Sequence, residues 1–312
     1  MLSVRPRLVL IAAALATVFA AGLLPGEAHA GKYDLDLTRL GSDGQGNITK
    51  DDNEFRSLSS ELGTVVALQP MDPADSLGLS GFAVSADVSL NTISNTESYW
   101  SEPTGGAADG VVPTVQLVGR KGLWPGLEIG GGATHVFDSS MWAMGGYGKL
   151  ALHEGFHHLP IPSIALRGSF SRLLGAKDFN MTTASAGVSI SHVFGVGKTF
   201  SLTPYLGYEA LFILSRSQVL DSTPSCDEFP DNFNEDQCSG DGGSTEFVYK
   251  NSGGILRHRP YLGMRMVFSV IRLGFEAMIV PAGSSSGDVD GQTVSDQSGL
   301  QQQYTFSAGL DF

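Results

Sequence analysis

The sequence predicts an all-β fold: a closed antiparallel transmembrane β-barrel of about ten strands, preceded by a short N-terminal arm with a helix. From residue 81 onward, segments of about ten residues alternate apolar residues with small or polar ones, and this period of two is typical of β-strands. The chain holds 40 glycines and only 16% charged residues, which suits a curved sheet closed on itself, apolar outside and polar inside. The alternation continues through "YTFSAGLDF" to the C-terminal Phe312.

The first residues have the pattern of a secretory signal peptide. Arg5 and Arg7 form a basic start, residues 8–24 are mainly apolar, and an Ala-His-Ala tripeptide ending at Ala30 offers a cleavage site. A spanning helix would need roughly 20 apolar residues and would carry no cleavage site. We therefore expect an exported chain that is cleaved after Ala30.

This reading divides the chain into three parts. Residues 1–30 are the signal peptide, residues 31–80 are the arm, and residues 81–312 are the barrel. The arm carries a helical pattern, because Phe55, Leu58, Leu62 and Val65 recur every three or four residues. We expect it to lie inside the barrel as a plug or at the periplasmic mouth. If the arm instead forms two strands, the barrel has twelve.

The charge of the mature chain restricts its partners. The full chain has 19 basic and 32 acidic side chains, and the signal peptide removes Arg5, Arg7 and Glu27, which leaves 17 against 31. This excess of acid argues against nucleic acid as a partner and against binding to anionic lipid surfaces. No cofactor is predicted. After residue 31 no apolar run reaches the length of a spanning helix, so a membrane must be crossed with strands.

Ten strand segments can be placed, an even number as single-chain bacterial barrels require. The long connections at 93–111, 215–255 and 282–301 all fall on one side of the sheet, and the barrel's two ends fall on the other. Barrels of this kind have long outer loops and short periplasmic turns. The predicted strands are 81–92, 112–121, 126–137, 141–152, 162–173, 181–194, 199–214, 256–268, 270–281 and 302–312. Pro204 lies inside one of them, where a bulge is expected because proline removes a ladder donor.

Charged residues fall on the inward register of these strands. They are either a charged constriction that selects solutes or ion pairs that fill a narrow lumen, and we favour the ion pairs because both signs occur. The ten lumen residues are Asp87, Arg120, Glu128, Lys149, Arg167, Glu209, Arg259, Arg265, Arg272 and Glu276.

The loop over 215–255 contains the two cysteines, Cys226 and Cys238. An even pair in an exported chain predicts a disulfide. Carboxylates between them could bind Ca²⁺, although a solvated loop tip is the simpler interpretation and no metal is predicted. These acids are Asp227, Glu228, Asp231, Glu235 and Asp236.

No catalytic set can be assembled from the sequence. The strand pattern does not place a histidine at a shared height with a serine and an aspartate, as a hydrolase triad requires. We expect that the chain is not an enzyme, with a barrel hydrolase as an alternative.

The C-terminus resembles the signal of Gram-negative outer-membrane β-barrels. That signal has a final aromatic residue, apolar residues at alternate positions before it and an aromatic residue upstream. The resemblance implies an outer-membrane location and recognition by the barrel assembly machinery. The matching residues are Tyr304, Phe306, Ala308, Leu310 and Phe312.

Two further stretches carry resemblances. "MWAMGGYGKLALHEGF" is similar to a group of outer-membrane barrels without an assigned function, and the arm followed by "LGLSGFAV" resembles plugged barrels that take up fatty acids and other hydrophobic compounds. The expected function is thus an integral outer-membrane barrel, porin-like in class, that is structural or passes small solutes, with hydrophobic-compound transport as an alternative. Outer-membrane lipid and lipopolysaccharide are the expected surroundings, and a small solute or hydrophobic molecule the expected ligand.

Overall fold

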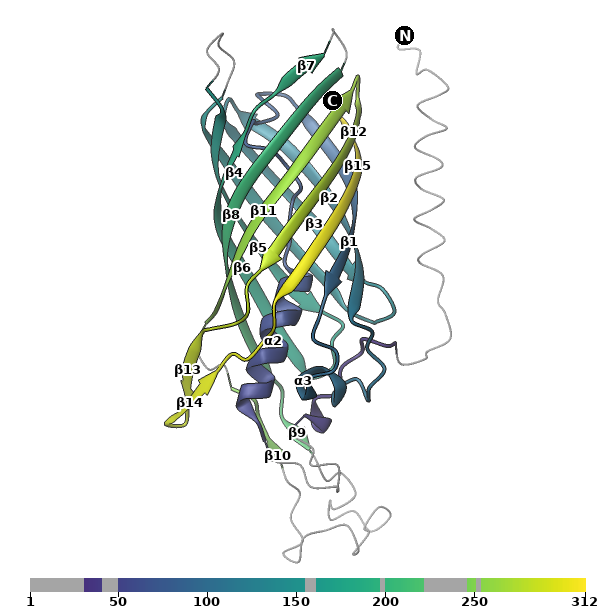
Figure 1. Ribbon diagram of the computed structural model, residues 1–312, viewed down its shortest axis with the longest axis vertical. Helices are drawn as coiled ribbons and strands as arrows, with labels where there is room; N and C mark the ends of the chain where they lie inside the picture. The colour runs from purple at the N-terminus through teal and green to yellow at the C-terminus, as the bar shows by residue number, and fades with distance from the viewer. Residues whose placement is uncertain (1–30, 41–49, 155–160, 197–199, 222–245, 251–253) are drawn as a thin grey trace, which may run out of the picture. The chain divides into compact units, whose positions relative to one another are not determined.

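The computed structural model describes residues 31–40, 50–154, 161–196, 200–221, 246–250 and 254–312. Ten long strands form one antiparallel ring in which each strand pairs with its neighbours in the sequence (Figure 1). The prediction of a ten-strand barrel is confirmed. The ring strands are β1 (Phe82–Thr92), β2 (Val111–Trp124), β3 (Leu127–Val136), β4 (Trp142–His153), β5 (Ser163–Leu174), β6 (Phe179–Ser191), β8 (Phe200–Ser217), β11 (Ile255–Phe268), β12 (Ile271–Val280) and β15 (Gln301–Asp311).

The first and last strands close the ring. β1 pairs with β15 from Ala83 opposite Asp311 to Asn91 opposite Gln303. Beyond the ladder, Phe82 and Phe312 exchange backbone hydrogen bonds of 3.0 and 2.7 Å. In hydrocarbon an unpaired backbone group costs several kcal/mol, so this closure removes the open edge that a ten-strand sheet would otherwise expose. The apolar stripe of the last strand therefore runs to the end of the chain because that strand closes the ring.

The two faces of the ring differ as the alternation predicts. On β1, Val84, Val88 and Leu90 are 40–43% exposed, whereas Ser85 and Asp87 between them are buried. Exposed leucine, isoleucine, valine and phenylalanine side chains continue around the other strands. An outward apolar face and an inward polar face are the arrangement of a barrel that spans a membrane.

The two ends of the barrel are unlike. The turn end holds the short connections, the short strand β7 (Phe194–Val196) and the C-terminus, and the loop end holds the long connections (Figure 1). The loop end also carries small elements that the alternation did not reveal. They are α3 (Ser98–Ser101) and the strand pairs β9 (Leu220–Asp221) with β10 (Glu246–Phe247) and β13 (Ser286–Val289) with β14 (Gln292–Ser295).

The arm folds as a helix and not as strands. η1 (Leu37–Arg39) is a short 3-10 helix, and α2 (Asp52–Val66) is the predicted helix, capped by Asp51, whose side chain accepts from the Asn53 and Glu54 amides. Among the described residues no helix has the length and apolar character needed to cross a membrane. Because the arm adds no strand to the ring, the alternative of twelve strands is wrong.

The register of the ladder shifts at two places, and neither of them is at Pro204. Register shifts lie between Gly122 and Trp124 and between Ala151 and His153, both at the turn end. Pro204 is paired with Met264 on one side, and its carbonyl accepts from the His192 amide at 3.2 Å on the other. The expected bulge at Pro204 is therefore wrong, because the register of β8 with β11, and with β6 and β7, is the same on both sides of the proline.

Candidate functional site: the occupied lumen

The arm continues from α2 into the barrel and follows β5 through it. The carbonyl oxygens of Val66 and Leu68 accept from the hydroxyls of Ser171 (3.3 Å) and Ser169 (3.0 Å), and that of Pro70 accepts from Arg167 (3.3 Å). The contacts move two residues at a time along both chains, in opposite directions. Since β5 ends at the loop end, the arm runs from the loop end toward the turn end.

The arm reaches the turn end before β1 begins. The Ala74 amide donates to Ser191 at 3.1 Å, the Leu77 amide donates to Glu128 at 3.1 Å, and Ser76 accepts from the Gly126 amide in the β2–β3 turn at 3.3 Å. Every residue from 55 to 74 is buried. The arm therefore occupies the lumen along its length, which is the plug position of the two that the sequence left open.

Asp72 is the centre of the contacts between the arm and the wall. Its Oδ1 lies against Arg120, and against Arg265 at 3.2 Å, and its Oδ2 lies against Lys149. These strands, β2, β11 and β4, come from separate parts of the ring. Asp72 is 3% exposed, so the carboxylate sits in a medium where charge attraction is much stronger than in water. One arm residue thus ties three strands together.

Neighbouring arm residues reinforce this contact. Asp75 pairs with Arg265, and Lys149 donates to the backbone oxygens of Pro73 (3.1 Å) and Asp75 (2.8 Å). Gln69 and Gln116 of β2 form a reciprocal pair, in which the Gln69 amide donates at 3.1 Å and its carbonyl accepts at 2.7 Å. The backbone of this irregular segment is thereby satisfied by wall side chains, as a buried backbone must be.

Two further carboxylates of the wall are paired on the other side of the lumen. Glu209 lies between Arg167, at 2.6 Å, and Arg259. Glu276 accepts from the Tyr205 hydroxyl at 2.8 Å and from the Gln69 side chain of the arm. The lumen is therefore filled by mutually bonded polar groups and not by a free row of one charge.

The arm also balances the charge of the wall. All ten predicted lumen residues are buried. Six of them are lysine or arginine and four are aspartate or glutamate, so the wall has two cations in excess. Asp72 and Asp75 supply two negative charges at the place where the cations gather. The ion-pair interpretation of the lumen charges fits this arrangement. The strand pattern alone did not show that acids of the arm belong to these pairs.

α2 is fixed at the loop end through Glu61. This buried carboxylate accepts from the Ser94 amide (2.9 Å) and hydroxyl (2.7 Å), the Tyr99 hydroxyl (3.0 Å), the Trp100 indole (2.8 Å) and the Gly299 amide (3.0 Å). Burial raises the pKa of Tyr99, and the adjacent Glu61 charge raises it further. One helix residue therefore joins the β1–β2 loop to the β12–β15 loop.

Close approach of α2 to the wall depends on Gly63. A Cβ atom at this position would lie 2.6–2.8 Å from three side-chain atoms of Ile213 on β8. On the neighbouring β11, Arg257 donates to Ser60 of the helix at 2.6 Å and to the Pro281 carbonyl at 2.8 Å. The helix thus fits tightly into the loop end of the barrel.

The start of the arm lies at the loop end as well. Lys32 pairs with Asp109 at 3.1 Å, the Tyr33 amide donates to the Asp138 carbonyl at 3.3 Å, and the Asp34 carboxylate accepts from Ser140. These partners all belong to connections on the loop side. The arm therefore enters the barrel from the loop end and leaves it at the turn end.

The remaining predicted sites are the C-terminal signal, the cysteine pair and the acidic loop. The C-terminal residues form the outward and final positions of β15, with Phe306 56% and Phe312 57% exposed. Cys226, Cys238 and the five acids between them lie outside the described residues. Among the described residues, no group of three or more His, Cys, Asp or Glu is arranged to hold a metal ion.

Sequence reasoning missed the arm residues Gln69, Asp72, Asp75 and Glu61. Two signals could have found Asp72 and Asp75. They are the acids of "QPMDPADS", a segment with no helix or strand period, and the wall has two unbalanced cations. A non-periodic acidic segment next to a cationic lumen is a candidate plug.

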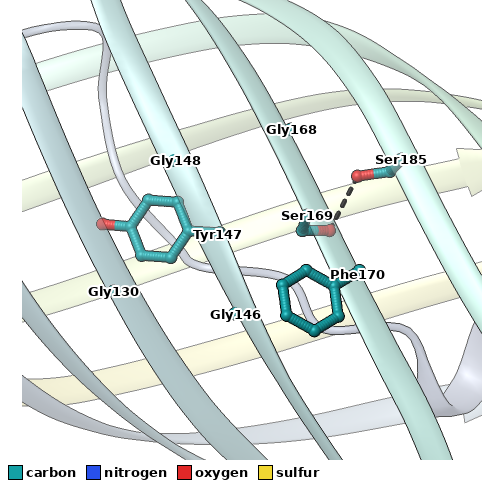
Figure 2. Close-up of a pocket in the computed structure, with 8 residues that line it drawn as sticks. All are labelled: Gly130, Gly146, Tyr147, Gly148, Gly168, Ser169, Phe170 and Ser185. Atoms are coloured by element: carbon teal, nitrogen blue, oxygen red, sulfur yellow. Dashed lines mark hydrogen bonds between the residues drawn. The ribbon is translucent and has the colours of Figure 1, made fainter.

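One hollow of about 420 Å³ interrupts the barrel wall. Figure 2 shows it between β3, β4, β5 and β6, where Gly146, Gly148 and Gly168 leave the wall without side chains and Phe170 lies alongside. The Ser169 and Ser185 hydroxyls are hydrogen-bonded at 2.7 Å beside it. The hollow is lined by glycine, aromatic and hydroxyl groups, and its lining contains no carboxylate, imidazole, thiol or amine.

Comparisons with known proteins give distant matches to solved barrels. No family model matches the chain, and no curated protein matches it. Neisserial surface protein A, NspA, is 11% identical over 74% of this chain and 95% of its own, with a TM-score of 0.27. Ail of Yersinia pestis is 12% identical over 75% and 97%, with a TM-score of 0.23.

The outer membrane protease OmpT from Escherichia coli is 8% identical over 75% of this chain and 96% of its own, with a TM-score of 0.33. Likenesses this distant assign no activity, and the fold rests on the strand pairings described above. By those pairings and by its outward apolar face, the chain is an integral β-barrel of the outer-membrane type.

Proposed function

We propose that the chain is an integral protein of the Gram-negative outer membrane whose lumen is closed by its own N-terminal arm. It acts as a structural barrel that presents its loop end at the cell surface, and not as an open pore. The observation that supports this most directly is Asp72, which holds the arm to three strands at once. Cleavage after Ala30 and assembly by the barrel assembly machinery belong to the same proposal.

Conductance across planar lipid bilayers tests the closed lumen. The refolded full-length mature chain should give no stable conductance. The double variant Asp72→Asn with Asp75→Asn should give intermittent openings, because the arm then loses its charged contacts. Asp290→Asn is the matched control, since Asp290 is exposed and pairs with Lys250 outside the lumen. Steady conductance of the unchanged protein would overturn the proposal.

Passage of small solutes is the second candidate, and one observation favours it. Residues 67–81 contain neither helix nor strand, so the arm could leave the lumen without unfolding regular structure. The emptied wall would keep an excess of two cations and should favour anions. Anion-selective openings in the double variant would support this gated role, whereas openings without charge preference would contradict it.

The proposal includes no catalytic step and no transport of hydrophobic compounds. A lateral exit for such compounds would need a gap in the wall. At Pro204 the pairing of β8 with β11 is continuous, and on the other side the His192 amide donates to the Pro204 carbonyl. The described histidines lie apart on different strands, with His135 stacked on Trp142 and His258 bonded to Tyr208. Co-purification of a stoichiometric fatty acid with the barrel would contradict this part of the proposal.

A further inference from the structure

Among the described residues, the outward face of the ten strands carries permanently charged side chains of one sign only. Its fully charged side chains are Lys121 on β2, Arg172 on β5 and Arg216 on β8, and no aspartate or glutamate occupies an outward position of these described strands. The chain as a whole has a net charge of −13. In so acidic a chain, an outward surface without carboxylates is a specific arrangement and does not follow from composition.

Two of the three cations lie at the loop end, on the two strands that flank β6. Arg172 is paired in register with Thr182 on β6, and Asn180, two residues before Thr182 and nearer the loop end, is paired with Arg216. Arg172 donates to the Thr182 hydroxyl at 3.0 Å and to the Asn180 side-chain oxygen at 3.1 Å. Its guanidinium is therefore drawn toward the loop end, next to the position of Arg216.

Another cation near Arg172 and Arg216 comes from the turn between β5 and β6. Lys177 is exposed, and the next residue, Asp178, accepts a 2.8 Å hydrogen bond from the Gln218 amide at the end of β8. This bond holds the turn beside the strand that carries Arg216. Asp178 is the one described carboxylate in the turn itself and is half-buried. Three residues, which we name the rim cations, thus form a positive patch over β5, β6 and β8. They are Arg172, Lys177 and Arg216.

The rim cations have no anionic partner in the described part of the chain. No carboxylate there lies within ion-pair distance of Arg172, Lys177 or Arg216, and the partners of Arg172 are a neutral hydroxyl and a neutral amide. Their charge is available to an external anion. Guanidinium groups bind phosphate oxygens through paired, charge-assisted hydrogen bonds, so phosphate is the group that this patch fits best.

The surface between the patch and the middle of the barrel is apolar. Phe170, Phe212 and Leu214 are outward and 46–61% exposed on the same strands. The hollow beside Gly168 is lined by Phe170, two residues from Arg172 along β5, which is about 7 Å at the rise of a strand. A bound molecule with phosphate at the patch would therefore lie with its hydrocarbon against this surface.

We propose that the rim cations bind the phosphate of a phosphorylated glycolipid of the outer leaflet, with its acyl chains along β5 and β6. This rests on the proposed outer-membrane location. The negative net charge of the chain does not oppose it, because among the described strand residues only cations occupy outward positions at this height. A phosphate-bearing amphiphile matches both the rim cations and the apolar surface beside them, whereas free phosphate would match only the rim cations.

Lipid binding by the full-length chain in phosphatidylcholine vesicles tests the proposal. Vesicles contain bisphosphorylated lipid A, dephosphorylated lipid A, or neither with inorganic phosphate added. The expected result is tight binding of the bisphosphorylated lipid only, and a loss on the order of tenfold in the double variant Arg172→Gln with Arg216→Gln, since two charge-assisted contacts are removed. Lys121→Gln, which removes the outward cation at the turn end, should bind as the unchanged chain does.

Equal binding by the double variant and the unchanged chain, or equal binding of the dephosphorylated lipid, would overturn the proposal. A stronger effect of Lys121→Gln than of the double variant would overturn it too. Gel mobility before and after boiling separates this failure from failure of the outer-membrane assignment. A chain that migrates differently when folded but does not distinguish the two lipids refutes the lipid site alone, whereas a chain without that difference refutes the barrel.

Discussion

Asp72 of the arm and Arg120 of β2 form an ion pair inside the barrel, with side chains only 3% and 1% exposed. The pair joins a segment without regular structure to a strand 48 positions further along the chain. A buried pair is expensive to form, but removal of one partner is worse, because an uncompensated charge is left in a low-dielectric environment. The position of the arm in the lumen is therefore sensitive to this single carboxylate.

Asp72→Asn should destabilise the folded chain. Arg120, Lys149 and Arg265 would keep their charges and lose their common partner, at a cost of about 3–5 kcal/mol in the free energy of unfolding. Urea or guanidinium unfolding of the refolded barrel in detergent measures the change. Asp290→Asn, which alters an exposed pair, should leave the free energy of unfolding almost unchanged, because exposed ion pairs contribute little to stability. Equal effects of the two variants would contradict the role of Asp72.

Glu61→Gln should loosen the loop end while the barrel stays intact. A glutamine at this position presents an amino group to the Ser94, Tyr99 and Trp100 donors and leaves buried donors unpaired, each at about 1–3 kcal/mol. Limited proteolysis should cut the 93–110 and 281–300 connections faster than in the unchanged chain. Glu97→Gln, at an exposed position of the same connection, should leave the cleavage rate unaltered.

The stability of the loop end should fall in alkali through Tyr99. Burial and the Glu61 charge raise the pKa of Tyr99 above its ordinary value of 10.0. An acid with a higher pKa in the folded chain keeps its proton longer there, so its stabilisation is complete below pH 10 and decreases as the pH rises through the folded value. Stability measured from pH 8 to 11 should fall less steeply in Tyr99→Phe. Parallel curves for the two proteins would contradict this assignment.

The N-terminal end of the mature chain should be accessible from outside the cell. Residues 32–36 bond to loop-end connections, such as Lys32 to Asp109, and loop ends face outward in outer-membrane barrels. An epitope inserted after Ala30 should bind antibody on intact cells. An epitope inserted at Pro125, in a turn of the opposite end, should bind only after the outer membrane is permeabilised. The reverse pattern of antibody binding would show that the turn end, and not the loop end, faces the cell exterior.

The sequence predicted the ring because the alternation that marks a strand depends only on residues close together in the chain. Strand alternation placed all ten strands, and the same alternation put Asp87, Arg120 and Glu276 on the face that the structure buries. The helix over 52–66 was visible for a similar reason, since its apolar residues recur with the helical period. Each of these features is determined by residues close together in the chain.

The position of the arm inside the barrel could not be predicted from periodicity. Residues 67–80 have no period, and the partners of Asp72 are at positions 120, 149 and 265, which only the closed ring brings together. The ladder shifts at 122/124 and 151/153 were equally hidden, because they arise where two strands meet a turn. Pro204 gave the opposite error, since a proline can remain in a ladder when its neighbours supply the remaining bonds.

Cross-linking of the arm to the wall measures the central claim most directly. Leu68 of the arm packs against Val118 of β2 inside the barrel, whereas Val84 of β1 faces outward. Leu68→Cys combined with Val118→Cys should be joined by a short thiol-specific cross-linker in intact cells, and the linked peptides should be identified by mass spectrometry. Leu68→Cys combined with Val84→Cys should not be joined. Absence of the first link, or equal yields of the two, would show that the arm does not occupy the lumen.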